Sequence, residues 1–123
     1  MGVYSVKQET VIVCGQEFVV SQANVMAGAK RDILITEAHE AFNRKHEIAE
    51  EEFPVELMAL RFIETLLYPS LVCCTVSKGE PLPTIEEFLS MPSSEQEIWE
   101  NAVKRQNPHF FPASTTEQQE KKD

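Results

Sequence analysis

Two short apolar runs near the N-terminus, separated by a turn and with only imperfect alternation of apolar and polar residues, predict a β-hairpin. Apolar residues gather at positions 11–13 and again at 18–20, and the four residues between them, Cys14 to Glu17, have the length of a hairpin turn and include a glycine. We therefore expect a small hairpin within residues 1–20, with strand character from Val3 to Val20. Because an isolated hairpin is marginally stable in water, helices are expected to cover one face and another subunit the other.

A helical period replaces the strand pattern after the hairpin. Ser21 is a suitable N-cap for a helix that begins at Gln22, and apolar residues drift along one side of this segment to about Lys45. Gly28 lies inside the segment and costs about 1 kcal/mol relative to alanine, so a break or a close helix contact is expected near it. The pattern predicts a first helix of roughly six turns.

A broader apolar stripe follows Pro54, which suits the first turn of a helix. The width of this stripe predicts that residues 55–68 form the central core helix. Pro69 lacks a backbone N–H, so the helix is expected to end or kink near Tyr68 before it continues, if at all, to Thr75, with a turn over residues 77–81. The stripe consists of Val55, Met58, Phe62, Ile63, Leu66 and Leu67.

Two short helices are expected between the later prolines. Thr84 and Glu87 have the spacing of a capping box, and Pro92 limits the first of these helices to about two turns, with Ile85, Phe88 and Leu89 as its apolar stripe. Ser93 or Ser94 can cap the second helix, which Asn107 and Pro108 end. Its predicted buried face consists of Ile98, Trp99, Ala102 and Val103.

These elements together predict a mainly α fold with a small N-terminal β-hairpin, an α+β class in which about four helices form a compact bundle. We expect one domain over residues 1–112. The polar run over residues 113–123 has no apolar periodicity and is expected to be a disordered C-terminal tail.

The net charge and the number of cysteines limit which classes of partner the protein can bind and in which cellular compartment it is expected. The chain has a formal charge of -9, and no Lys or Arg lies between Lys78 and Lys104, so we expect no nucleic-acid partner. Three cysteines leave an odd count, which favours a reducing compartment. No apolar run has the roughly 18 residues that a membrane span needs, and no secretory signal pattern opens the chain. These features predict a soluble, intracellular protein.

The sequence contains no recognisable catalytic, cofactor or metal constellation. His39 and Glu40 begin like a zinc-protease motif, but Asn43 stands where the second histidine is required. A surface metal site made of His39, His46 and Glu50 is the less favoured alternative to solvated histidines. Cys73 and Cys74 follow an apolar stripe and are interpreted as core residues with raised pKa values. We therefore predict a protein that is not an enzyme.

A few large aromatic residues are the candidate partner contacts. Trp99 is interpreted first as a core anchor and second as an interface residue, and Tyr68 is a further candidate. Phe110 and Phe111 follow a proline and precede the polar tail, so they either pack back on the domain or form an exposed apolar hook for a partner. The exposed side of the helix over residues 55–68 is also too apolar for a fully solvated face.

The second half of the chain resembles the tail assembly chaperones of long-tailed bacteriophages and related prophages. Three features carry the resemblance: a helix that ends in YPSLVCCT, the short helix PTIEEFLSMP, and the closing helix WENAVKRQNPHFF. The resemblance implies a small helical protein that binds the long helical tape measure protein and keeps it soluble until tail tube subunits replace it. It also implies self-association, a location in the cytoplasm of the bacterial host, and absence from the mature particle.

Two alternatives remain open from the sequence. A structural virion-assembly or adaptor protein would use the hairpin to extend a partner sheet and would stay in the particle. An enzyme is the third class, and it would need a pocket lined by His39, His46 and nearby carboxylates.

Overall fold

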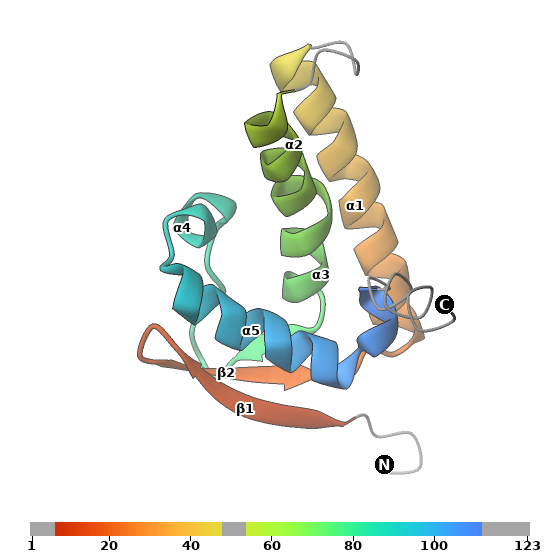
Figure 1. Ribbon diagram of the computed structural model, residues 1–123. Helices are drawn as coiled ribbons and strands as arrows, with labels where there is room; N and C mark the ends of the chain where they lie inside the picture. Colours follow the sequence, from red (N-terminus) through yellow and green to blue (C-terminus); the bar gives the residue numbers. More distant parts are fainter. Residues whose placement is uncertain (1–6, 48–53, 112–123) are drawn as a thin grey trace, which may run out of the picture.

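The structure is a computed structural model that describes residues 7–47 and 54–111. It confirms a mainly helical α+β fold with a β-hairpin near the N-terminus (Figure 1). The predicted tail over residues 113–123 lies outside the described residues. The elements are β1 (Gln8–Val13), β2 (Gln16–Ser21), α1 (Val25–His46), α2 (Val55–Phe62), the π-helical segment η2 (Ile63–Leu67), α3 (Tyr68–Val72), β3 (Thr75–Ser77), α4 (Ile85–Leu89), α5 (Ser93–Gln106) and the 3-10 turn η3 (Pro108–Phe110).

The hairpin is present, and its turn is tighter than the sequence suggested. Only Cys14 and Gly15 lie between the strands, and their φ angles of 52° and 78° are both positive, as a type I′ turn requires. The predicted four-residue turn is therefore wrong in length, because Gln16 and Glu17 already pair with β1. The turn is also tied to α5, since the Cys14 backbone N–H donates to Glu95 Oε1 at 2.7 Å.

A third strand, which the sequence pattern did not reveal, completes the sheet. β3 pairs antiparallel with β2, so the order is β1-β2-β3, and Thr75 lies opposite Val20. At three residues, β3 is too short to display a period of its own. Val13, Phe18, Val20 and Thr75 are buried on the inner face of the sheet, whereas Ile12 and Val76 are 51% and 61% exposed on the other face.

Helix α5 covers the inner face of the sheet and places Trp99 at the centre of the core. The indole is fully buried, as predicted for a core anchor, and its ring meets Phe18 of β2 and Phe88 of α4 edge-on, with centroid distances of 5.0 and 5.6 Å. Trp99 Nε1 donates to Thr75 Oγ1 at 2.8 Å. One side chain therefore joins β2, β3, α4 and α5.

The two short helices form as predicted, with local corrections. The capping box between Thr84 and Glu87 is present in both directions. The N-cap of α5 is Pro92, so neither Ser93 nor Ser94 caps it. Ile98, predicted to be buried, is 38% exposed, because the residue before Trp99 points about 100° away from it around the helix.

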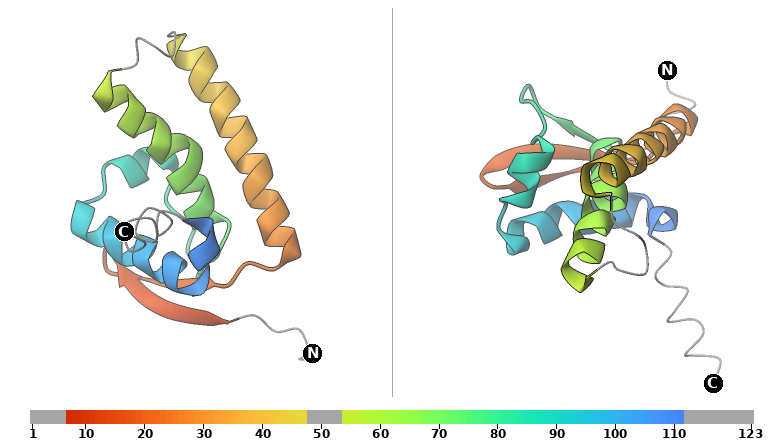
Figure 2. Two further views of the ribbon diagram at one scale, coloured as in Figure 1. Left: turned by 45° about the vertical axis from the view of Figure 1, so that its right-hand side comes forward. Right: turned by 90° about the horizontal axis from the view of Figure 1, so that it is seen from above.

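Helix α1 begins three residues later than predicted. Asn24 is its N-cap, and its Oδ1 accepts from the Ala27 backbone N–H at 2.8 Å. Ser21 cannot cap α1, because it is the last residue of β2 and donates through its backbone to Cys74 O at 2.7 Å. α1 runs antiparallel to the long helix made of α2, η2 and α3 (Figure 2), and Phe42 is its single buried residue.

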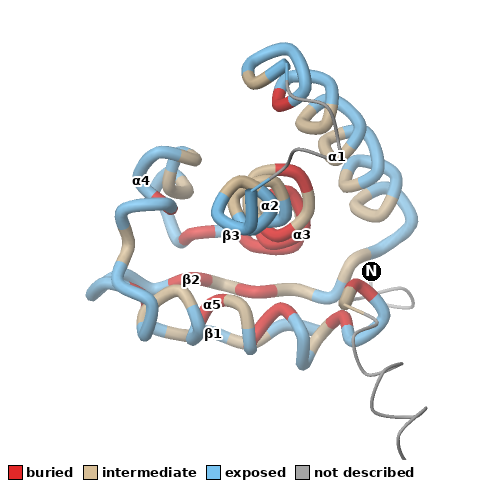
Figure 3. The backbone as a smooth tube through the Cα atoms, turned by 45° about the horizontal axis from the view of Figure 1, so that its top comes forward, coloured by how far each residue is buried: buried red, intermediate tan, exposed pale blue. Residues whose placement is uncertain are grey.

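The long helix does not end at Pro69. Its π-helical segment η2 precedes the proline, and the Tyr68 backbone N–H bonds to Ile63 O, five residues earlier, so the chain continues helically to Val72. The prediction that residues 55–68 form the central core helix is wrong for its first half. α2 has no buried residue, and its backbone is coloured only as intermediate or exposed in Figure 3. The buried positions of the long helix begin at Thr65, because α2 lies at the end of this helix that is remote from α5 and the sheet (Figure 1).

The Trp99 hydrogen bond gives a direct test of this core. Replacing Thr75 with valine preserves its shape but leaves the buried indole N–H without an acceptor, so we expect a loss of about 1–3 kcal/mol in the free energy of unfolding by urea denaturation. Thr10→Val, at an exposed position of β1, is the matched control and should change stability by less than about 0.5 kcal/mol. Equal effects from the two substitutions would contradict this role.

Candidate functional site

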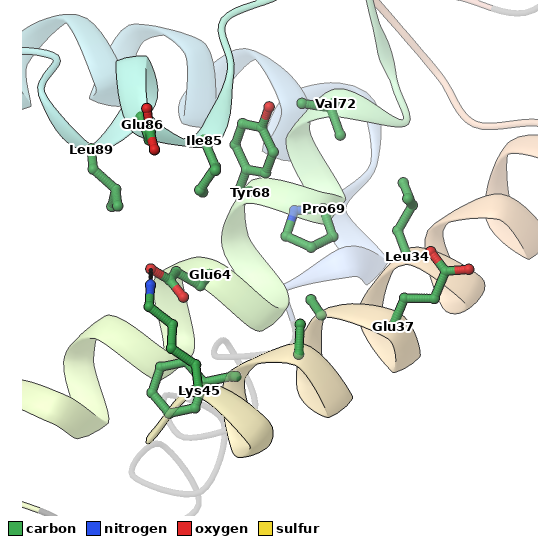
Figure 4. A pocket seen from close by; sticks show the side chains of 13 residues that line it. Leu34, Glu37, Lys45, Glu64, Tyr68, Pro69, Val72, Ile85, Glu86 and Leu89 are labelled. Atoms are coloured by element: carbon green, nitrogen blue, oxygen red, sulfur yellow. Dashed lines mark ion pairs between the residues drawn. The ribbon is translucent and has the colours of Figure 1, made fainter. Parts of the chain in front are cut away.

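An apolar groove lies between α1 and α4, and the long helix forms its floor. Its volume is about 460 Å³. Figure 4 shows Leu34 of α1 on one side of Tyr68 and Pro69, and Ile85 and Leu89 of α4 on the other. The apolar lining consists of Leu34, Ala38, Ala41 and Phe42 from α1, Tyr68, Pro69 and Val72 from α3, and Ile85 and Leu89 from α4.

The groove exists because α1 is fastened without filling the space beside it. Near its start, Arg31 donates to Ser70 Oγ at 2.8 Å and to Phe110 O at 3.2 Å, and its guanidinium carbon lies 4.2 Å from the centre of the Phe110 ring. Near its end, Phe42 is buried. Between these anchors two of the groove-lining residues, Ala38 and Ala41, are small, so they leave space between α1 and α4.

The opposite wall is held by the aromatic core. Phe88 is 4% exposed, and its ring lies 5.3 Å from that of Tyr68 and 5.6 Å from that of Trp99, measured between centroids. With Phe88 directed inward and the first turn fixed by the capping box, Ile85 and Leu89 of the same short helix face the groove. Leu89 is 41% exposed there, so the wall presents apolar surface to solvent.

The polar groups inside the groove already have partners. The Tyr68 hydroxyl donates to Pro83 O at 2.6 Å, and burial raises the pKa of Tyr68, so this side chain presents its ring to the groove. Lys45 Nζ lies 3.9 Å from Glu64 Oε2 (Figure 4). Two further carboxylates, Glu37 and Glu86, are exposed at the rims. This arrangement is suited to apolar side chains bounded by acidic edges.

A second apolar surface lies on α2. Val55, Met58 and Phe62 are 79%, 55% and 47% exposed and follow one another at helical spacing. The hypothesis from the sequence that this helix has an apolar side exposed to solvent is confirmed for these three residues. Its role in contacting a partner stays a prediction.

The candidate contact residues take different positions in the structure. Tyr68 lines the groove, and Trp99 is fully buried. Phe110 is 4% exposed beneath the Arg31 guanidinium, so the expectation that it forms an exposed hook is wrong: its ring belongs to the core and anchors α1. Phe111 packs partly buried against the same core, with Lys104 Nζ 5.7 Å from its ring centre.

Sequence reasoning missed most of the groove. The alanines of α1, and Ile85 and Leu89 of α4, are ordinary helical residues. They line one groove only because of the position in which α1 packs on the long helix. One signal was available in the first helix, whose groove-facing positions, at helical spacing, include two alanines where a core helix would carry large residues.

The histidines do not converge in the described part of the chain. His39 Nδ1 lies 3.5 Å from an Arg61 guanidinium nitrogen, and the His46 ring is tilted by 42° against that of Phe42, with 4.2 Å between the ring centroids. Glu50, the third member of the alternative metal site, lies outside the described residues. Over residues 7–47 and 54–111, no group of three His, Cys, Asp or Glu side chains could hold a metal ion.

The adjacent cysteines differ from each other. Cys74 is 2% exposed, and its hydrogen bond to Cys73 together with burial raises its pKa, as expected for a core thiol. The pKa of Cys73 is lowered, which contradicts the expected rise, because its hydrogen bond with Cys74 and the nearby Arg31 charge favour the thiolate. The two sulfur atoms are 3.5 Å apart.

None of the helices in the described ranges is both long and apolar enough to cross a membrane. Comparisons with protein-family models, with curated proteins and with solved structures find no match to this chain. The candidate site therefore stands on its geometry and chemistry.

The position of Phe110 predicts a structural role. Phe110→Ala removes a buried ring and the surface on which Arg31 rests, so we expect a loss of about 3–5 kcal/mol in unfolding free energy. Phe111→Ala, at the partly buried neighbour, should cost about 1 kcal/mol. Thermal and urea denaturation followed by circular dichroism measure both effects. An F110A variant as stable as the wild type would restore the exposed-hook interpretation.

Proposed function

We propose that this protein is a non-enzymatic tail assembly chaperone of a long-tailed phage or prophage, which binds the tape measure protein and keeps it soluble during tail morphogenesis. It acts in the cytoplasm of the bacterial host and hands its client over to tail tube subunits. The observation that carries the proposal is the apolar groove between α1 and α4. Inside it, the Tyr68 hydroxyl is hydrogen-bonded and Lys45 is paired with Glu64, and its apolar wall faces solvent.

Physical reasoning connects the groove to a helical client. A long amphipathic helix exposes an apolar stripe that aggregates unless a partner covers it. The groove has a helix on each side and a third helix as its floor, so a client helix can pack into it with its apolar stripe against these three helices. The net charge of -9 on the chaperone keeps the complex soluble. The resemblance in the second half of the chain supports this proposal, since that half supplies the floor and one wall.

Exposed apolar surface outside the groove supports additional contacts. Val55, Met58 and Phe62 on α2 extend the surface available to a long client or to another copy of the chaperone. The self-association that the resemblance implies would use surface of this kind.

A structural adaptor retained in the particle is the second candidate. The outer face of the sheet favours it, because Val19 and Val76 are cross-strand neighbours there and Ile12, which pairs with Glu17, is half exposed on the same face. β1 also stands at the edge of the sheet order, where a partner strand could pair. Such an adaptor would stay in the mature particle.

Co-expression with the tape measure protein of the same genome tests the chaperone proposal. We expect the wild-type protein to raise the soluble fraction of the client and to co-purify with it. Leu89→Lys places a charge on the groove wall and should weaken binding at least tenfold, because covering a leucine contributes about 1.5–3 kcal/mol. Ile98→Lys, at a similarly exposed position on α5 away from the groove, is the matched control.

Three results separate the candidates. A client that stays insoluble and does not co-purify with the wild-type protein contradicts the chaperone proposal. Equal loss of binding in L89K and I98K moves the contact away from the groove. Mass spectrometry of purified particles should not detect this protein if it is a chaperone and should detect it if it is an adaptor.

A further inference from the structure

The groove is bordered by acidic side chains on both of its walls. Glu37 of α1 and Glu86 of α4 line it from opposite sides, and both are exposed. Within residues 7–47 and 54–111, neither carboxylate forms an ion pair, whereas Glu64 Oε2 within the groove lies 3.9 Å from Lys45 Nζ. The two rims thus carry negative charge that is not neutralised by these neighbours, and the space between them is apolar.

We propose that the groove binds a single amphipathic α-helix whose apolar stripe rests on Tyr68 and Pro69 and whose two flanks each carry a Lys or Arg, one facing Glu37 and the other Glu86. This inference rests on the proposed function and specifies the client segment. The recognised feature is an apolar stripe with basic residues on both of its sides.

Backbone chemistry favours a helix over an extended segment. Every N–H and C=O of a peptide that enters an apolar site needs a partner, and a helix satisfies these groups internally. The groove offers an extended strand little to pair with, because the floor and both walls are helical and the Tyr68 hydroxyl is engaged by Pro83 O. Ala38 and Ala41 also permit a helix to approach α1 closely.

The acidic rims select among helices. A basic residue beside each rim forms an exposed ion pair, which strengthens binding only a few-fold, whereas an acidic residue in the same place is repelled. Two such contacts on opposite sides of one stripe discriminate by charge and fix how the helix lies in the groove. A second copy of this chain is a less suitable occupant, because both copies carry a net charge of -9.

Three synthetic helices test the inference with the full-length protein. The peptides share one apolar stripe and differ only in the residues that flank it, which are Lys, Gln or Glu. Fluorescence anisotropy at low salt should rank their affinities as Lys above Gln above Glu, with about fivefold between successive peptides. Raising the ionic strength to about 0.5 M should compress the differences, because exposed charges are then screened.

Charge reversal supplies the matched variants. Glu37→Lys with Glu86→Lys should reverse the ranking, so that the Glu-flanked helix binds best. Glu40→Lys with Glu97→Lys changes the net charge equally at exposed helical positions that do not line the groove, and it should keep the original order. Circular dichroism melting of both variants verifies that they are folded.

Equal binding of the three peptides, no binding of any of them, or reversal of the ranking by the control variant would overturn the inference. The chaperone proposal is tested separately, by co-purification of the tape measure protein. Co-purification without charge ranking rejects the paired basic flanks and leaves the chaperone function standing. Charge ranking without co-purification supports the helix site and rejects the tape measure protein as its client.

Discussion

Packing around Trp99 is the interaction on which the rest of the structure depends. The indole lies edge-on to Phe18 and Phe88 and donates to Thr75, so it joins the sheet, the short helix α4 and the covering helix α5. A five-residue helix has no stability of its own in water, and α4 keeps its place because Phe88 is buried against this centre. The wall of the groove is therefore a consequence of the core.

Helices α1 and α2 differ from α4 and α5, because a smaller share of their side chains is buried. α1 buries a single side chain over 22 residues, and α2 buries none over eight. Hydrogen bonds from Arg31 to Ser70 and Phe110, and the contact of its guanidinium with the Phe110 ring, help to hold α1 in place. Apolar surface on the walls and on α2 is left in contact with solvent, which is typical of a surface that a partner covers. A chaperone for amphipathic helices requires such surface.

Features that depend on neighbouring residues could be predicted from the sequence, whereas the packing of distant elements against one another could not. The capping box at Thr84 and Glu87, the hairpin and the burial of Trp99 depend on neighbouring residues or on one strong apolar side chain. β3 was not predicted, because three residues are too few to show a period. The helix was expected to end or kink near Tyr68, but the π-helical segment before Pro69 lets it continue without the proline's missing N–H. The burial of Phe110 depends on Arg31, 79 residues earlier, whose guanidinium lies over its ring, and no local pattern indicates this contact. The groove needs α1 and α4 together, and their separation in the chain hides it.

Amide hydrogen exchange on the complex with the tape measure protein tests the central claim most directly. If the groove holds the client, exchange should slow in α1 between Leu34 and Lys45 and in α4, while β1 exchanges as in the free protein. Slower exchange confined to the sheet, with α1 and α4 unchanged, would contradict the account and place the client on the hairpin.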